Sequence, residues 1–216
     1  MRIELDSGAE ARLTGEVGER AVVCVNGGKG AEAPGTWSAS VEYLVRALAP
    51  ASPSLAFVEV RYRVKSWRRL DECVEDGRAA IAAARERGAR QLALLGFSMG
   101  AAVSVRIADE PEVTTVIGLA PWLPPQLDLA PLAGRRLAVV HGALDAPLPG
   151  IPGVKPSVSA DAHRRALALG VESERTVIGP AIHAIALRAR SGRLVPMPGA
   201  RRWVGLVRAE LERFCA

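Results

Sequence analysis

The stretch Gly96-Phe97-Ser98-Met99-Gly100 places a hydroxyl between two glycines, after an apolar run and before an Ala/Val-rich one. A serine hydroxyl is a weak nucleophile until a neighbouring base takes its proton. A sharp strand-to-helix turn exposes such a serine, and glycine two positions to either side avoids steric clashes there. The first N–H groups of the following helix also offer a positive dipole end to a developing oxyanion. Ser98 is therefore a candidate nucleophile, the alternative being a helix N-cap.

The segments around Ser98 alternate between strand and helix patterns. An edge pair is expected at 2–6 and 10–17, buried strands at 20–28, 54–62, 90–97, 113–121, 135–142 and 171–179, and helices at 36–49, 68–88, 99–110, 159–170 and 200–214. The helix at 159–170 is expected to begin at a serine N-cap. This alternation predicts an α/β fold, a mostly parallel twisted sheet with helices on both faces, in a single domain over 1–216. Ligand sites in such folds lie beyond the carboxyl ends of the strands.

Composition narrows the class of protein. The chain has 216 residues, an apolar fraction of 49%, a charged fraction of 24% and a net charge of +5, which is typical of a globular domain. No apolar stretch approaches the roughly 20 residues of a membrane span, and the N-terminus lacks a signal-peptide pattern, so a cytoplasmic location without membrane contact is expected. No nucleic-acid motif is present. The three cysteines form neither a disulfide pattern nor a zinc spacing, and no metal or cofactor is expected.

Four segments carry a family resemblance. "VCVNGGKG", "LLGFSMGAAV", "VVHGALDAPLP" and "VIGPAIHAI" make the chain similar to the α/β-hydrolase superfamily from about Ala21 onward. The resemblance implies catalytic residues in the order serine, acid, histidine. Ser98, Asp145 and His183 stand in that order, each after a predicted strand.

The resemblance assigns a role to the second and third of these residues. Asp145 would accept a hydrogen bond from the ring N–H of the histidine on the side away from the serine, and it would stabilise the imidazolium. The alternative is an aspartate that forms an Asx-turn. His183 would be the general base, although a histidine in an apolar setting is more often a core residue. His141 is expected to have no catalytic duty, and His163 is expected to be exposed at a helix start.

An oxyanion hole needs a second N–H from the loop after the strand at 20–28. Asn26-Gly27-Gly28-Lys29-Gly30 occupies that place, and the backbone amides of Gly28 and Met99 are the expected donors. A phosphate-binding loop is disfavoured, because Lys29 is not followed by Ser or Thr.

The surroundings of the site can also be anticipated. The link at 121–134 is too short for a cap domain, so an uncapped cleft is expected, as in small esterases and dienelactone-hydrolase-like proteins. Trp122 and Leu123 on that link, with Asn26 and Lys29, are expected to line the substrate pocket. Trp37 and Trp67 are further candidates, and the role of the loop at 146–158 stays open.

The resulting functional prediction is a serine hydrolase that cleaves an ester, thioester or lactone of a small-molecule acyl substrate through an acyl-enzyme. Two alternatives remain. The same three residues could serve an acyltransferase, or the chain could be a non-catalytic binding protein on a degenerate hydrolase fold. The latter is motivated by Asn26 and Ile182 at positions where the family often has His and Gly, and by the long Pro- and Gly-rich loop after Asp145. The sequence does not determine the oligomeric state.

Overall fold

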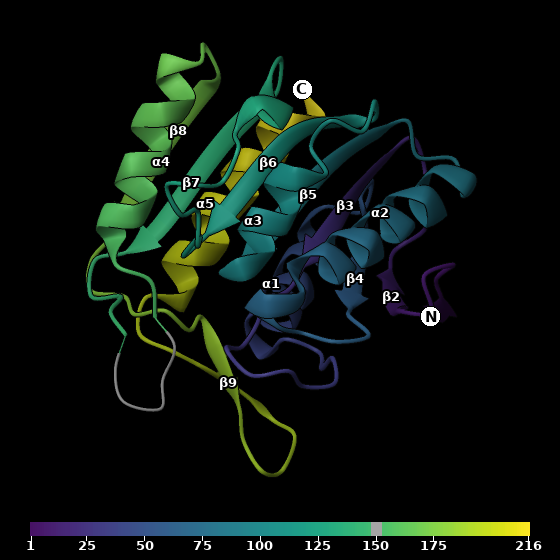
Figure 1. The fold of residues 1–216 in the computed structure, drawn as a ribbon. Helices are drawn as coiled ribbons and strands as arrows, with labels where there is room; N and C mark the ends of the chain where they lie inside the picture. The colour runs from purple at the N-terminus through teal and green to yellow at the C-terminus, as the bar shows by residue number, and fades with distance from the viewer. Residues whose placement is uncertain (148–152) are drawn as a thin grey trace.

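The computed structural model describes residues 1–147 and 153–216 and contains an eight-stranded sheet (Figure 1). The strand order is β1-β2-β4-β3-β5-β6-β7-β8. The strands are β1 (Arg2–Glu4), β2 (Glu10–Thr14), β3 (Arg20–Val25), β4 (Ala56–Arg61), β5 (Gln91–Phe97), β6 (Val113–Leu119), β7 (Arg136–Gly142) and β8 (Glu172–Ile178). From β4 through β8 all neighbours are parallel, whereas β2 is antiparallel to both β1 and β4. The expected mostly parallel sheet with an antiparallel edge pair is confirmed.

Five α-helices cover the two faces of the sheet. They are α1 (Ala39–Leu48), α2 (Leu70–Glu86), α3 (Met99–Arg106), α4 (Pro156–Ala168) and α5 (Ala200–Cys215). Apolar side chains of α2, α3 and α4 join one core cluster, and those of α1 and α5 join the other (Figure 1). The strand β3 contributes alternate residues to each, because successive side chains of a strand point to opposite faces. The expected helices on both faces are confirmed.

Helix boundaries differ from the sequence-based expectation at several ends. The helix α1 begins at Ala39, because Ser38 lies outside it and its hydroxyl caps the Val41 amide at 3.3 Å. The helix α3 ends at Arg106, four residues before the expected end. The expected serine N-cap at the start of α4 was wrong. Pro156 occupies the first turn, where a missing N–H costs nothing, and Ser159 lies buried inside the helix.

The link between β8 and α5 contains an unexpected hairpin. It consists of β9 (Ala186–Arg188) and β10 (Leu194–Pro196), paired antiparallel, and it extends beyond the main sheet (Figure 1). The link between β6 and β7, by contrast, has only the 3₁₀ turn Ala130–Leu132 and no further helix. No cap therefore interrupts the fold at the place where one was considered.

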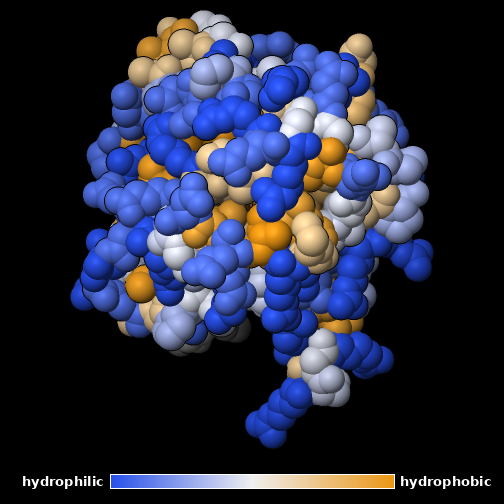
Figure 2. All heavy atoms as spheres, turned by 90° about the vertical axis from the view of Figure 1, so that its right-hand side faces the viewer, coloured by the Kyte–Doolittle hydropathy of each residue, from blue (hydrophilic) through white to orange (hydrophobic). Residues whose placement is uncertain are grey.

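The surface is mainly polar. Figure 2 shows one face, where hydrophilic side chains surround smaller apolar patches. Cys24 and Cys73 are buried and Cys215 is half-buried, all as free thiols. Within the described residues, no helix combines the length and apolar character needed to cross a bilayer.

Candidate functional site

Ser98 lies at the turn between β5 and α3. Its φ of 56° is in the left-handed region, which a non-glycine residue adopts only under strain. The turn is bonded on both sides: the Ser98 amide donates to Leu119 O at 2.9 Å, and the Trp122 amide donates to Ser98 O at 3.0 Å. Ala120, between those partners, also has a positive φ, of 43°. A strained turn braced in this way holds the serine side chain in one place.

The flanking glycines are explained by close backbone approach. A Cβ on Gly96 would lie 2.6 Å from the Cα of Ala101, inside the following helix. A Cβ on Gly100 would overlap the carbonyl oxygen of Val25 at the end of β3. Any larger residue would push α3 away from the sheet, so the spacing of these glycines is a packing requirement of the turn.

Ser98, His183 and Asp145 lie in one hydrogen-bonded row. The Ser98 hydroxyl is 3.0 Å from His183 Nε2, and His183 Nδ1 is 2.7 Å from Asp145 Oδ2. All three are buried, with exposed fractions of 6%, 9% and 2% in the order Ser98, His183, Asp145. The ring of Phe97 lies tilted against the imidazole, with centroids 5.2 Å apart. The structure thus brings together the three residues that the sequence separates by up to 85 positions.

Asp145 is held ionised by its partners. Burial alone would raise its pKa, but hydrogen bonds from His141 and His183 and the Val154 amide outweigh burial and lower the pKa below the ordinary carboxyl value. An ionised carboxylate at this place favours a proton on His183 Nδ1, which leaves Nε2 free to accept the serine proton.

The two loops that carry Asp145 and His183 are joined by backbone hydrogen bonds. The Leu144 amide donates to Ala181 O at 2.9 Å, and the Ala143 amide donates to Ile178 O at 2.8 Å. On the other side of His183, the Ser40 hydroxyl in α1 accepts the amides of Ile185 at 3.1 Å and Ala186 at 3.3 Å. Ser40 was not anticipated from the sequence, because nothing in α1 links it to a segment 145 residues away.

The loop after β3 passes over the start of α3. A Cβ on Gly27 would lie 3.3 Å from Ser98 Cβ, and one on Gly28 would overlap the Met99 thioether. Within the described part of the chain, no backbone acceptor takes the amide of Gly28 or of Met99. Asn26 is buried, and its amide group donates to Val60 O while Tyr62 Oη donates to Asn26 O at 3.0 Å. These two hydrogen bonds of Asn26 therefore fix the start of the loop.

A small cavity of about 240 Å³ opens at Ser98. Asn26, Gly27, Gly28, Thr36, Trp37, Ser38, Ala39, Lys65, Phe97, Ser98 and His183 line it. At its rim, burial and the neighbouring charge of Lys29 lower the pKa of Lys65, whose amine donates to Thr36 Oγ1. Of the expected lining residues, Asn26 and Trp37 take part.

Four other expected lining residues lie elsewhere. Leu123 is buried in the apolar core, and Trp122 stacks on Trp67 with centroids 5.9 Å apart. Lys29 is exposed, with its carbonyl accepting the Trp67 amide at 3.0 Å. None of these four is among the described residues that line the cavity. Packing places Leu123 in the core, and the sequence of a Pro-rich link does not show whether an apolar residue in it will be buried.

The remaining histidines differ from expectation in one case. His163 lies in the interior of α4, half-buried, with Nδ1 2.8 Å from Ser173 Oγ; the expected exposed position at a helix start was wrong. Part of the loop at 146–158 lies outside the described residues. In its described part, the Val154 amide donates to Asp145 Oδ1 at 3.0 Å.

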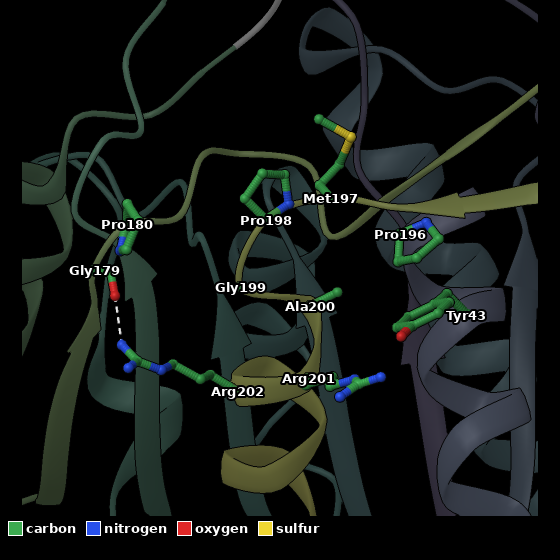
Figure 3. A pocket seen from close by; sticks show the side chains of 10 residues that line it. All are labelled: Tyr43, Gly179, Pro180, Pro196, Met197, Pro198, Gly199, Ala200, Arg201 and Arg202. Carbon is green, nitrogen blue, oxygen red and sulfur yellow. Dashed lines mark hydrogen bonds between the residues drawn. The ribbon is translucent and has the colours of Figure 1, made fainter.

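A second, larger hollow of about 500 Å³ lies between α1 and the start of α5 (Figure 3). Tyr43, three prolines and two arginines contribute to its wall, and Arg202 donates to Gly179 O. Neither Ser98 nor His183 lines it, so its greater size does not make it part of the serine site.

Comparisons with known proteins bear on the fold. No protein-family model and no curated protein matches the sequence. Among solved structures, the chain is similar to a dienelactone hydrolase-like promiscuous phosphotriesterase from metagenomic libraries, with 17% identity, a TM-score of 0.68, and coverage of 98% of this chain and 95% of the other. It is also similar to an α/β serine hydrolase without a lid from Xanthomonas campestris (18%, 0.64, coverage 99% and 91%).

A third similar structure is a sugar hydrolase from Lactococcus lactis, with 18% identity, a TM-score of 0.73, and coverage of 99% of this chain and 97% of the other. All three matches span nearly the whole chain at low identity, and the Xanthomonas protein is described as lacking a lid, as this chain has no cap between β6 and β7. The expected architecture is confirmed, and the chain has the α/β-hydrolase fold in its uncapped form.

Proposed function

We propose that this protein is a serine hydrolase that cleaves an ester, thioester or lactone bond of a small molecule, with Ser98, His183 and Asp145 as its catalytic residues. The observation that carries the proposal is the row of hydrogen bonds from Ser98 Oγ to His183 Nε2 at 3.0 Å and from His183 Nδ1 to Asp145 Oδ2 at 2.7 Å. The serine stands on a strained turn at the start of a helix, where an activated nucleophile is accessible to a carbonyl carbon.

The reaction follows from the protons of this row. Ser98 Oγ attacks the carbonyl carbon while His183 Nε2 takes its proton, and Asp145 stabilises the imidazolium. The amides of Gly28 and Met99 donate to the oxyanion of the tetrahedral intermediate. Its collapse forms the acyl-enzyme, and His183 returns the proton to the departing alcohol or thiol. Water then attacks the acyl group, with His183 as base, and Ser98 is regenerated.

The cavity supports a small acyl substrate. Its volume of about 240 Å³ lies below the usual 300–1,000 Å³ range of drug-sized ligand sites, and Trp37 and Phe97 give it an aromatic wall. Short acyl esters fit this space better than long-chain lipids do.

The test compares Ser98→Ala with Ser104→Ala. Ser104 lies buried in α3, the helix that follows Ser98, and its hydroxyl has no hydrogen-bond partner among the described residues, so it is a control for the loss of a buried hydroxyl. We expect Ser98→Ala to lower the hydrolysis of p-nitrophenyl acetate by roughly 10⁴-fold or more, with an unchanged melting temperature. The Ser104 variant should keep wild-type turnover and wild-type labelling by a fluorophosphonate probe. A wild-type protein that the probe does not label would favour the non-catalytic alternative.

A further inference from the structure

His141 is a fully buried histidine that the proposed reaction does not use. It lies at the end of β7, four residues before Asp145, and its side chain has no exposed surface. Its Nε2 is 3.1 Å from Asp145 Oδ2 and 2.8 Å from Val154 O, and its Nδ1 is 2.8 Å from Ser159 Oγ. Two imidazoles, of His141 and His183, therefore face the same carboxylate oxygen.

The partners of His141 assign its protons. Both neighbours of Nε2 are acceptors, a carboxylate and a carbonyl, so Nε2 carries the hydrogen and shares it between them. Nδ1 faces a hydroxyl and accepts from it in the neutral ring. Val154 completes a closed ring of contacts, because its amide donates to Asp145 Oδ1 while its carbonyl accepts from His141.

The outer end of this network is fixed by an arginine. Arg175 on β8 donates through Nε to Ser159 Oγ at 3.1 Å and through Nη2 to Pro156 O at 3.0 Å. The Ser159 hydroxyl lies 3.0 Å from Pro156 O and 2.8 Å from His141 Nδ1. Because Arg175 also donates to Pro156 O, the hydroxyl hydrogen is shared between that carbonyl and His141 Nδ1. Arg175 thus fixes Ser159 beside His141 Nδ1, and the two acceptors at Nε2 set the tautomer that donates to Asp145.

We propose that His141 is a positioning residue for the acid of the serine site: its Nε2–H holds Asp145 Oδ2 in the orientation that His183 Nδ1–H requires. This proposal rests on the proposed function, in which Asp145 orients His183. Without the His141 donor, the carboxylate would keep, among the described residues, the donors of His183 and Val154, and Oδ2 could rotate away from the imidazole. His141 touches neither Ser98 nor the cavity that Ser98 opens.

The proposal has a pH signature. The charged and titratable groups around Asp145 are His183 from the loop after β8, His141 from β7 and, beyond Ser159, Arg175 from β8. The hydrogen bond from His141 is one cause of the lowered pKa of Asp145. Its removal raises that pKa, so activity lost by protonating Asp145 is lost at a higher pH.

The experiment compares His141→Phe, His141→Gln and His163→Phe. Phenylalanine keeps a planar ring and removes the donor, whereas the glutamine amide can reach the place of Nε2 and donate. His163→Phe is the matched control, because His163 bonds only Ser173 among the described residues. We measure the rate of fluorophosphonate labelling of Ser98 against pH, and the downfield proton resonance of His183 Nδ1–H in each variant.

His141→Phe should slow labelling about ten- to hundredfold, the range for one lost hydrogen bond to a charged group, and should shift the acid limb of the profile upward. Its His183 Nδ1–H resonance should broaden or move upfield. His141→Gln should restore both, and His163→Phe should leave both unchanged.

These measurements distinguish a failure of the inference about His141 from a failure of the proposed function. Labelling of His141→Phe at a reduced rate with an unshifted acid limb and an unchanged His183 resonance would make His141 merely structural and would overturn the inference. Absence of labelling in the wild-type protein would instead refute the proposed function, and the His183 resonance would still report whether His141 positions Asp145.

Discussion

The two halves of the serine site are built by different means. On the acid–base side, Asp145 receives hydrogen bonds from the side chains of His141 and His183 and from the Val154 amide, so polar donors fix its position. On the opposite side, the loop at Gly27 and Gly28 lies close to Ser98 and Met99, because glycine has no side chain that would keep them apart. One half is fixed by polar partners and the other by close backbone approach.

This difference follows from what each half must stabilise. A buried carboxylate is costly unless donors surround it, so the acid–base side needs several polar groups. An oxyanion forms only transiently and needs backbone N–H groups aimed at an otherwise unoccupied position. Substitutions on the first side should therefore act through charge and pH, and those on the second side through shape.

The largest effect is expected on the acid–base side. Asp145→Asn keeps the shape but removes the charge and offers an N–H where an acceptor is needed, so kcat/KM for p-nitrophenyl acetate should fall by roughly 10⁴-fold. Asp161→Asn is the control, because Asp161 lies on α4 and, in the described part of the chain, pairs with two arginines of that helix and with no other cation. A loss of kcat/KM below tenfold for Asp145→Asn would show that the acid–base side of the site does not depend on its charged and hydrogen-bonded groups.

A smaller effect is expected on the glycine side. Gly28→Ala introduces a methyl group that overlaps the fully buried Met99 thioether, which should displace the loop and lower kcat about tenfold to hundredfold without a shift of the pH profile. Gly30→Ala is matched, since its methyl would meet only Trp67 at 3.9 Å. A shifted pH profile in Gly28→Ala would contradict the division into a charge half and a shape half.

The smallest effect tests the connection between His183 and α1. Ser40→Ala removes the hydroxyl that accepts the Ile185 and Ala186 amides, so the free energy of unfolding should fall by about 1 kcal/mol and kcat/KM about threefold. Thermal unfolding and steady-state rates measure the two. An unchanged rate at lower stability would show that the other contacts of the loop suffice to place His183.

Sequence reasoning succeeded where local patterns carry the information. The mostly parallel sheet with helices on both faces followed from the alternating elements, and the grouping of Ser98, Asp145 and His183 followed from the family resemblance. The roles of Ser159 and Arg175 were inaccessible, because the contact of Ser159 with His141 and that of Arg175 with Ser159 depend on where α4 begins. Pro156 was the signal for that start, since proline is common in the first helical turn.

The positions of Trp122 and Leu123 show a second limit. Both follow a strand that ends beside Ser98, which suggested a pocket, but the chain turns inward after Ala120 and packs them against Trp67 and the core. Whether an apolar residue in a link faces a cavity or the interior depends on the path of the backbone, which has no periodic pattern there.

The bracing of the Ser98 turn has a consequence for how the protein loses activity. Its strained conformation is kept by bonds to Leu119 at the end of β6 and to Trp122 near the start of the link that follows, and Ala120 is in turn bonded to Val140 on β7 at 2.8 Å. Relaxing the turn thus requires three central strands to separate. Loss of the reactive serine geometry on heating should coincide with melting of the whole sheet, so enzyme inactivation and global unfolding form a single cooperative event.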